Sequence, residues 1–242
     1  MMMKKIIISF VLLIVAATTP GILAAQEAVR NESWKFGVGL YGWTASIGGK
    51  SAFGSDIDID FDDIIDKLEI AFMGVFGVRK GKWALMTDVI YMDVKDDKDI
   101  ALDLNASVEL KAWVVNPAIG YNVLEMEKAS LHILGGARYL SLKTELGLTG
   151  FSGVSDSRSV WDGIIGLRGR INLAEKWYMP FYGDIGTGDS DLTWQVMTGI
   201  AYKFSKFDVF LVYRYLDWDF DDDAVIDDLN INGPLIGIKF VF

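Results

Sequence analysis

Residues 161–171 carry the pattern from which the fold class follows, and they read Trp161-Asp162-Gly163-Ile164-Ile165-Gly166-Leu167-Arg168-Gly169-Arg170-Ile171. The odd-numbered positions hold apolar or small side chains, whereas the even-numbered positions include one aspartate and two arginines. Successive side chains of a β-strand point to opposite faces of a sheet, so a period of two indicates a strand with one apolar and one polar face. The segment therefore predicts a β-strand.

The same period of two returns along most of the chain. Residues 34–40, 83–91 and 207–215 all alternate large apolar side chains with small or charged ones. Repeated amphipathic strands predict an antiparallel, all-β protein. Two classes fit this pattern. In a soluble sandwich or barrel the polar face meets water, whereas in a membrane barrel the apolar face meets lipid and the polar face lines the lumen.

The composition narrows the functional classes. The 242 residues are 51% hydrophobic and 13% aromatic, with no cysteine, one histidine and a formal net charge of −10. This apolar content excludes an intrinsically disordered chain. The lack of cysteine excludes disulfides, thiolate zinc sites, iron–sulfur clusters and cysteine nucleophiles. The acidic balance argues against nucleic acid as a partner, because phosphates bind basic surfaces.

Residues 1–25 have the layout of a secretory signal peptide. A short basic start is followed by an apolar stretch at 6–17 and then by small residues and helix breakers around Pro20. The apolar stretch is shorter than the roughly 20 residues that a membrane-spanning helix needs. We therefore expect export, cleavage near Ala25, and a mature chain, 26–242, that forms a single barrel domain.

The connections favour the membrane barrel. Short turns at 80–82, 174–176 and 205–206 alternate with longer acidic connections. This alternation is typical of short periplasmic turns and longer external loops. An interfacial girdle would place an aromatic residue at the start of each strand that leaves a short turn. The aromatic residues in such positions are Trp83, Trp177 and Phe207, with Trp34 opening the first strand.

The chain ends on an alternating strand that contains Gly237, Phe240 and the terminal Phe242. This ending resembles the C-terminal assembly signal of bacterial outer-membrane barrels. Together with the expected signal peptide and the strand pattern, it makes the whole chain similar to the small outer-membrane β-barrel proteins of Gram-negative bacteria, a porin-like class. The resemblance implies Sec-type export, residence in outer-membrane lipid, and recognition of the last strand by the barrel-assembly machinery.

We expect ten strands, with eight as the alternative. An even number keeps both termini on the periplasmic side. In the segment 101–123 the apolar residues change from even to odd positions, so we expect a β-bulge at 112–116 beside Pro117. The expected strands are 34–47, 69–79, 82–95, 101–123, 130–146, 157–173, 177–187, 192–204, 207–219 and 234–242.

The strand pattern assigns charged residues of both signs to the lumen. Because an unpaired buried charge costs several kcal/mol, these residues must be paired or wet. Two interpretations stay open: a filled, ion-paired interior, or a water-filled pathway for small solutes or ions. The central network is predicted as Asp88, Arg138, Asp162, Arg168, Arg170, Asp184 and Arg214. Further lumen positions are Glu69, Arg79, Glu109, Lys111, Lys203 and Lys239.

The first long connection, 48–68, carries a run of aspartates. Within it, residues 61–68 have the apolar spacing of a short amphipathic helix, which we expect to cover the barrel mouth as a lid or to bind a partner. The aspartates approach the ligand order of a calcium loop but lack its glycine. We therefore assign no cofactor or metal site, and expect at most loose divalent-cation contact at Asp58, Asp60 and Asp62.

Two further features give only weak evidence of function. Residues 37–42 spell the dinucleotide fingerprint G-x-G-x-x-G, but they lie inside an expected strand, so we interpret the match as accidental. The single histidine, His132, is expected in the lumen near the periplasmic rim.

We predict a non-enzymatic barrel with a structural or small-solute passage role. The alternatives are surface binding or adhesion through the acidic loops and, third, an outer-membrane hydrolase.

Overall fold

The computed structural model describes residues 33–51, 56–101, 104–148, 151–220 and 226–242. The expected signal peptide, 1–25, lies outside the described residues. Among these residues, no helix is long and apolar enough to cross a membrane.

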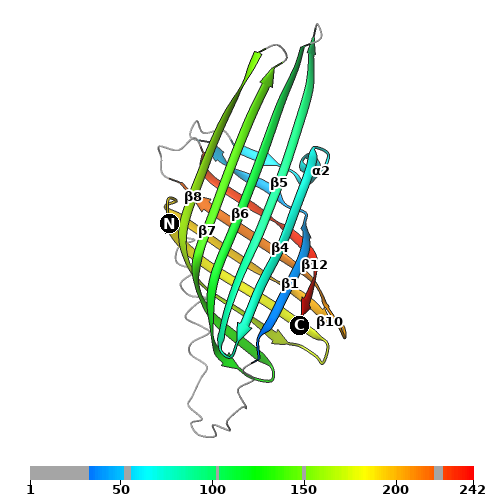
Figure 1. Ribbon diagram of the computed structural model, residues 1–242, viewed down its shortest axis with the longest axis vertical. Coiled ribbons are helices and arrows are strands. Elements are labelled where there is room, and N and C mark those ends of the chain that lie inside the picture. Colours follow the sequence, from blue (N-terminus) through cyan, green and yellow to red (C-terminus); the bar gives the residue numbers. More distant parts are fainter. Residues whose placement is uncertain (1–32, 52–55, 102–103, 149–150, 221–225) are drawn as a thin grey trace. The chain divides into compact units, whose positions relative to one another are not determined.

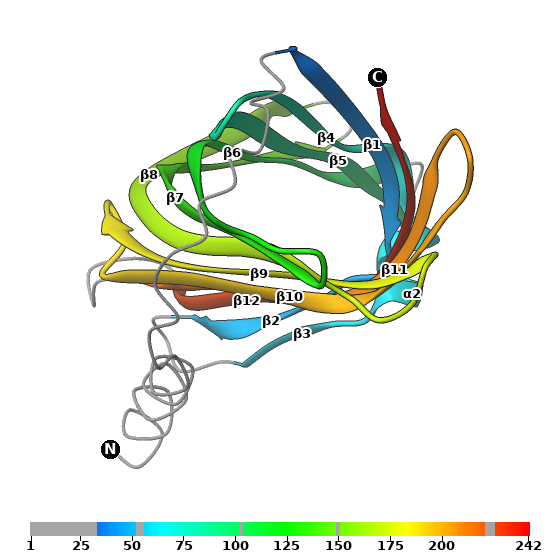
Figure 2. The same ribbon diagram turned by 90° about the horizontal axis from the view of Figure 1, so that it is seen from below.

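The structure is an antiparallel barrel of ten strands, and the first strand closes the sheet against the last. This confirms the predicted strand number and arrangement. Figure 1 shows the barrel from the side, and Figure 2 shows its closed ring of strands. Two further strands, β2 and β3, lie outside the ring. The barrel strands are β1 (Lys35–Trp43), β4 (Leu68–Lys80), β5 (Trp83–Ala101), β6 (Leu104–Glu125), β7 (Ala129–Leu148), β8 (Phe151–Asn172), β9 (Trp177–Gly188), β10 (Leu192–Lys203), β11 (Asp208–Asp219) and β12 (Ile226–Val241).

The strands are joined at one end by short turns, at 81–82, 126–128, 173–176 and 204–207. At the other end, here called the long-connection end, only the links between β1 and β4 (44–67) and between β11 and β12 (220–225) are longer. The ends of β5 and β6, of β7 and β8, and of β9 and β10 are separated by only two or three residues in the sequence, so the longer loops expected there are wrong and the strands themselves are extended instead. The turn between β4 and β5 contains Gly81, whose φ of 56° lies in the left-handed region that glycine adopts without a Cβ penalty. Both described chain ends, β1 and β12, reach this short-turn end. At the opposite end β5, β6, β7 and β8 extend well beyond the other strands (Figure 1).

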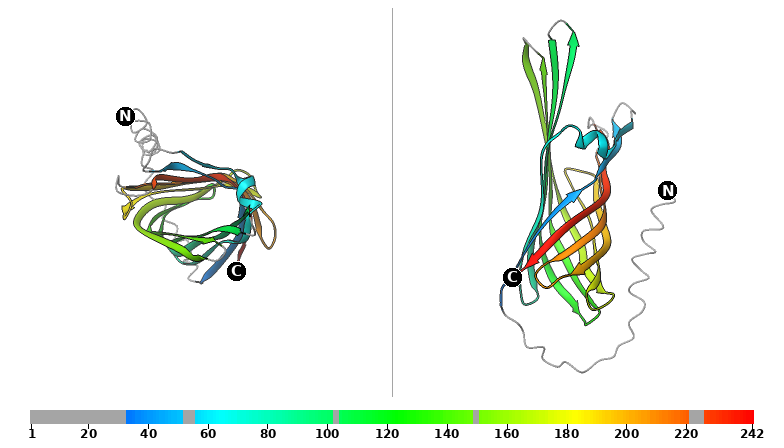
Figure 3. Two further views of the ribbon diagram at one scale, coloured as in Figure 1. Left: turned by 90° about the horizontal axis from the view of Figure 1, so that it is seen from above. Right: turned by 90° about the vertical axis from the view of Figure 1, so that its right-hand side faces the viewer.

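The first long connection is more structured than the sequence predicts. The expected strand 34–47 is broken after Trp43, and β2 (Ser46–Ser51) continues alongside β12 before turning back into β3 (Asp56–Ile59). The expected helix is present as α2 (Phe61–Ile65), with Ile64 buried. Figure 3 shows α2 at the edge of the barrel wall and not across the opening, so the prediction of a lid over the mouth is wrong.

The predicted bulge at 112–116 is also wrong. β6 pairs with β5 through this region without a change of register. Even-numbered residues point inward on both sides of it, since Ala112, Val114 and Ala118 are buried whereas Trp113 is exposed. Towards the long-connection end of β6, apolar residues change from odd-numbered to even-numbered positions because the inner face of the strand becomes apolar there.

This error misplaces two predicted lumen charges. Glu109 and Lys111 share the parity of Trp113, so they lie on the outer face of β6. There Lys111 contacts Glu109 and lies 3.8 Å from Asp93 on β5. These three charges therefore belong to the outer surface beyond the apolar band and not to the lumen.

The outer face carries an apolar band between two groups of paired aromatic rings. Trp83 and Tyr91 on β5 belong to opposite groups and lie eight residues apart, which is roughly 26 Å of strand. Such a band with aromatic borders is the outer surface of a transmembrane barrel. The pairs nearer the short turns are Trp83–Tyr121, Trp177–Tyr202 and Phe36–Phe242. The pairs nearer the long connections are Tyr91–Trp113, Tyr139–Trp161 and Trp194–Tyr215.

Candidate functional site: the barrel interior

The interior has three layers along the barrel axis. At the long-connection end it is a core of inward-facing apolar side chains, because here the inner faces of the strands are apolar. A layer of buried arginines follows, and a cavity occupies the short-turn end. The core includes Trp43, Ile90, Val114, Leu140, Val160, Leu216, Trp218, Phe220, Leu229 and Ile231.

Arg138 on β7 is the centre of one half of the arginine layer and is fully buried. Its Nη2 donates to both carboxylate oxygens of Asp184 at 2.7 Å. Its Nε donates to Asn116 Oδ1 at 2.9 Å and its Nη1 to Thr193 Oγ1 at 2.7 Å. The guanidinium also lies over the ring of Trp218 at 5.8 Å. Each nitrogen of this buried cation therefore has an acceptor, as its removal from water requires.

Arg214 on β11 forms the other half. Its Nη1 lies 2.8 Å from a carboxylate oxygen of Asp88, and its Nε donates to Gln195 Oε1 at 2.8 Å. Tyr41 donates its hydroxyl proton to Asp88 at 2.6 Å, and the guanidinium lies over the Trp43 ring at 4.9 Å. Both arginines are thus held between a carboxylate and a tryptophan from other strands.

The structure places all seven residues of the predicted central network on the inner face, but it divides them. Asp88 pairs with Arg214 and Asp184 with Arg138. Asp162 instead accepts hydrogen bonds from the backbone N–H and the hydroxyl of Ser190, at 2.9 and 2.8 Å. This contact ties the β9–β10 connection to the interior. Arg168 and Arg170 lie further down, in the cavity.

Sequence reasoning missed the neutral partners of the two arginines. Asn116, Thr193 and Gln195 are buried polar residues at inward positions of their strands, and Tyr41 bridges Arg214 and Asp88. These residues alternate in step with the inward-facing charged residues of their strands, so their place on the inner face could have been predicted. A polar side chain on the inner face of a narrow barrel needs a hydrogen-bond partner. Which residues meet across the lumen depends on the register and tilt of the strands.

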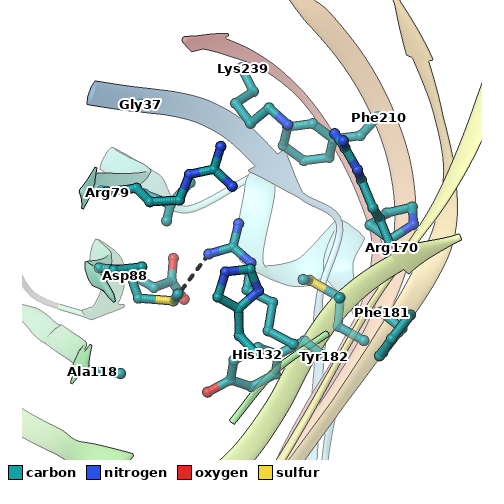
Figure 4. A pocket seen from close by; sticks show the side chains of 18 of the residues that line it. Gly37, Arg79, Asp88, Ala118, His132, Arg170, Phe181, Tyr182, Phe210 and Lys239 are labelled. Atoms are coloured by element: carbon teal, nitrogen blue, oxygen red, sulfur yellow. Dashed lines mark hydrogen bonds between the residues drawn. The ribbon is translucent and has the colours of Figure 1, made fainter. Parts of the chain in front are cut away.

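The cavity at the short-turn end has a volume of about 400 Å³. The cavity extends to the ends of β1, β4 and β12, since Lys35, Arg79 and Val241 are among its lining residues. Figure 4 shows Arg79, His132, Arg170 and Lys239 around this space, carried by four different strands. The arginine layer forms its inner end, through Asp88 and Arg214.

His132 lies in this cavity, at the short-turn end. Asn122 Nδ2 lies 3.4 Å from its Nε2, and Arg168 is its neighbour in the β7–β8 pairing. Neither contact supplies the carboxylate or the nucleophile that histidine-dependent hydrolysis needs. The glycines of the G-x-G-x-x-G match lie within β1, and Gly37 lines the cavity.

The aspartates of the first long connection are exposed and spread over different elements. Asp58 lies on β3, Asp60 precedes α2 and Asp62 lies in its first turn. Across the described part of the chain, no three histidine, aspartate or glutamate side chains come together in a way that could hold a metal ion.

The last strand forms the closing seam. Gly237 is tightly enclosed, since a Cβ there would meet the backbone oxygen of Leu40 at 2.5 Å and the ring of Phe210 at 2.5 Å. The rings of Phe36 and Phe242 stack at 6.3 Å, and Phe240 lies on the outer face 6.0 Å from Phe207. The residues of the predicted assembly signal thus also build the seam between β1 and β12.

A closed antiparallel barrel with an apolar, aromatic-bordered outer band defines an outer-membrane β-barrel protein. Neither a protein-family model nor a curated protein sequence matches the chain. Solved structures of outer-membrane barrels do match it.

The outer-membrane protease OmpT of Escherichia coli matches over 88% of this chain and 98% of its own, at 9% identity and a TM-score of 0.49. The attachment invasion locus protein Ail of Yersinia pestis matches over 87% and 99%, at 13% identity and a TM-score of 0.38. An outer-membrane channel of Pseudomonas putida F1 matches over 93% and 98%, at 10% identity and a TM-score of 0.43.

Proposed function

We propose that the protein is a non-enzymatic barrel of the Gram-negative outer membrane whose lumen is closed in its resting state. The observation that carries this proposal is that buried side chains pack inside the half of the barrel nearer the long connections. An apolar core lies there, and beside it every guanidinium nitrogen of Arg138 and Arg214 contacts a side-chain acceptor. A ten-stranded barrel whose interior is filled by side chains acts as a rigid structural body and not as an open pore.

The orientation of the barrel in the membrane is the one typical of outer-membrane barrels. The short turns and both described chain ends face the periplasm, and the long hairpins face the outside of the cell. Export through the Sec pathway, residence in outer-membrane lipid and recognition of Gly237, Phe240 and Phe242 by the assembly machinery belong to this proposal. The cavity then opens to the periplasm, so small solutes enter it from that side and stop at the arginine layer.

A liposome-swelling assay tests the proposal. Vesicles that contain the refolded barrel should swell no faster in a small neutral sugar than vesicles without protein. Swelling at the rate given by a known porin would contradict a closed lumen and support the passage role. The folded state is checked by the shift between boiled and unboiled protein on a gel.

Surface binding is the second candidate function. It is favoured by the hairpins β5–β6 and β7–β8, which project beyond the aromatic border, and by the exposed aspartates of β3 and α2. An acidic surface of this kind attracts a basic partner in a salt-dependent way. Retention of the barrel on a polylysine-coated surface at low salt, lost when the aspartates at 56, 58, 60 and 62 are replaced by asparagine, would support it.

A further inference from the structure

The cavity at the short-turn end holds more positive charge than its own carboxylates balance. Its acidic lining residues are Asp88 and Glu125, and Asp88 is already paired with Arg214. Lys239 is paired with Asp208 at 2.9 Å. This excess stands out in a chain whose net charge is −10. The cationic lining residues are Lys35, Arg79, Arg168, Arg170, Arg214 and Lys239.

Arg168 shows the imbalance most clearly. Its Nη1 contacts the sulfur of Met86 at 3.1 Å, and a thioether is only a weak acceptor. Among the described residues, no carboxylate lies within ion-pair distance of Arg79, Arg168 or Arg170, whereas Arg138 and Arg214 are both paired. A guanidinium inside a barrel needs an anion or water, and it has five donors to offer.

The cavity also has apolar walls. Val75, Met86, Met197, Phe210 and Leu235 line it, and Figure 4 shows Phe181 and Phe210 among the side chains around this space. A volume of about 400 Å³ lies within the range of small-molecule sites and is too small for a folded partner. Cationic and apolar side chains thus line the same cavity, and such a lining fits a molecule that has an anionic head and an apolar body.

We propose that this cavity binds a small organic anion, with a carboxylate or phosphate head at Arg79, Arg168 and Arg170 and an apolar body against Met86 and Leu235. Arginine suits this task because its planar donors match the oxygens of carboxylate and phosphate. The anion enters from the short-turn end, where the lining reaches the strand ends. The proposal goes beyond the closed lumen, since a periplasmic binding site needs no passage.

Isothermal titration of the folded barrel in detergent micelles tests this site, with phenyl phosphate, inorganic phosphate and phenol as three separate probes. Empty micelles provide the blank. Phenyl phosphate should bind at least about tenfold more tightly than either of the others, because only phenyl phosphate uses both the cations and the apolar walls. Its affinity should fall as the salt concentration rises.

The variant Arg168→Gln should weaken phenyl phosphate binding by about tenfold or more, because it removes charge-assisted hydrogen bonds. Arg158→Gln is the matched control: it lies on the same strand, over the ring of Phe220 at the opposite end of the interior, and should bind as the wild type does. A carboxylate head and a phosphate head are then compared by repeating the titration with benzoate.

The proposal is overturned if phenyl phosphate does not bind, or if Arg158→Gln weakens it as much as Arg168→Gln. Equal binding of phenol would show an apolar pocket that does not use the arginines. Equal binding of inorganic phosphate would show a simple ion site without use of the apolar walls. Both results contradict the organic-anion site.

Discussion

Arg138 on β7 and Asp184 on β9 form a buried ion pair that reaches across the inner face of β8, with Arg138 Nη2 2.7 Å from both carboxylate oxygens. Their side chains are 0% and 1% exposed. Strands that are not neighbours in the sheet are thereby linked through the lumen. The pair closes the barrel cross-section and also holds three consecutive strands at a fixed curvature.

Removal of one partner should therefore destabilise the barrel strongly. Asp184→Ala leaves Arg138 as an unpaired buried charge, for which a loss of about 3–5 kcal/mol in the free energy of unfolding is expected. Urea unfolding in phospholipid vesicles, followed by tryptophan fluorescence, measures this loss. The double variant Arg138→Met/Asp184→Leu should recover most of the stability, because an apolar pair needs no charge compensation.

The matched control is the exposed pair of Lys143 and Glu145, whose side chains are 47% and 39% exposed. Glu145→Ala should change the free energy of unfolding by less than about 1 kcal/mol, since water already screens the pair. Equal losses for Asp184→Ala and Glu145→Ala would contradict the central role of the buried pair.

The seam between β1 and β12 provides the second prediction. Gly237→Ala places a Cβ against the backbone oxygen of Leu40, which cannot move without opening the seam. We expect a loss of about 1–3 kcal/mol, as for other overpacked positions. The unboiled protein should lose its folded gel band at a lower temperature than the wild type does.

Gly42→Ala is the control for this seam. Gly42 also pairs with β12, opposite Ile236, but a Cβ there has nothing within 4 Å. Its folded band should persist to the wild-type temperature. If both variants melt alike, strand propensity and not close packing explains the effect of Gly237→Ala.

The features of this fold that could be predicted from the sequence are those that depend on the period of two. In residues 161–171 the alternation shows which side chains lie on the inner face and which on the outer face. The strand and the lumen positions of Asp162, Arg168 and Arg170 could therefore be predicted. The ten strands and the short turns followed in the same way. These features are local, and each strand of a barrel must satisfy them separately.

The failures have a common physical cause. At 101–123 the prediction assumed that the inner face is polar along its whole length, whereas this face becomes an apolar core above the arginine layer. Glu109 and Lys111 were therefore assigned to the wrong face. The partners of Arg138 and Arg214 could not be predicted either, because contacts across the lumen depend on strand tilt and register, which periodicity does not fix.

The apolar outer band leads to the third prediction. Ile165 on β8 is 68% exposed and lies between the two aromatic borders. Ile165→Lys places a charge in hydrocarbon, and we expect a loss of about 2–4 kcal/mol in the free energy of unfolding in vesicles. Ser159→Lys tests the same face of the same strand beyond Trp161, where the loss should be at most about 1 kcal/mol. Equal losses would contradict the assigned position of the membrane.

The closed lumen is tested most directly by the single-channel conductance of the refolded mature protein in a planar bilayer. The folded state is confirmed beforehand by the gel shift between boiled and unboiled samples. We expect a silent bilayer, because the apolar core and the Arg138 and Arg214 clusters fill the lumen. Discrete, reproducible conductance steps from folded protein would contradict it and would establish a continuous aqueous path past these two arginines.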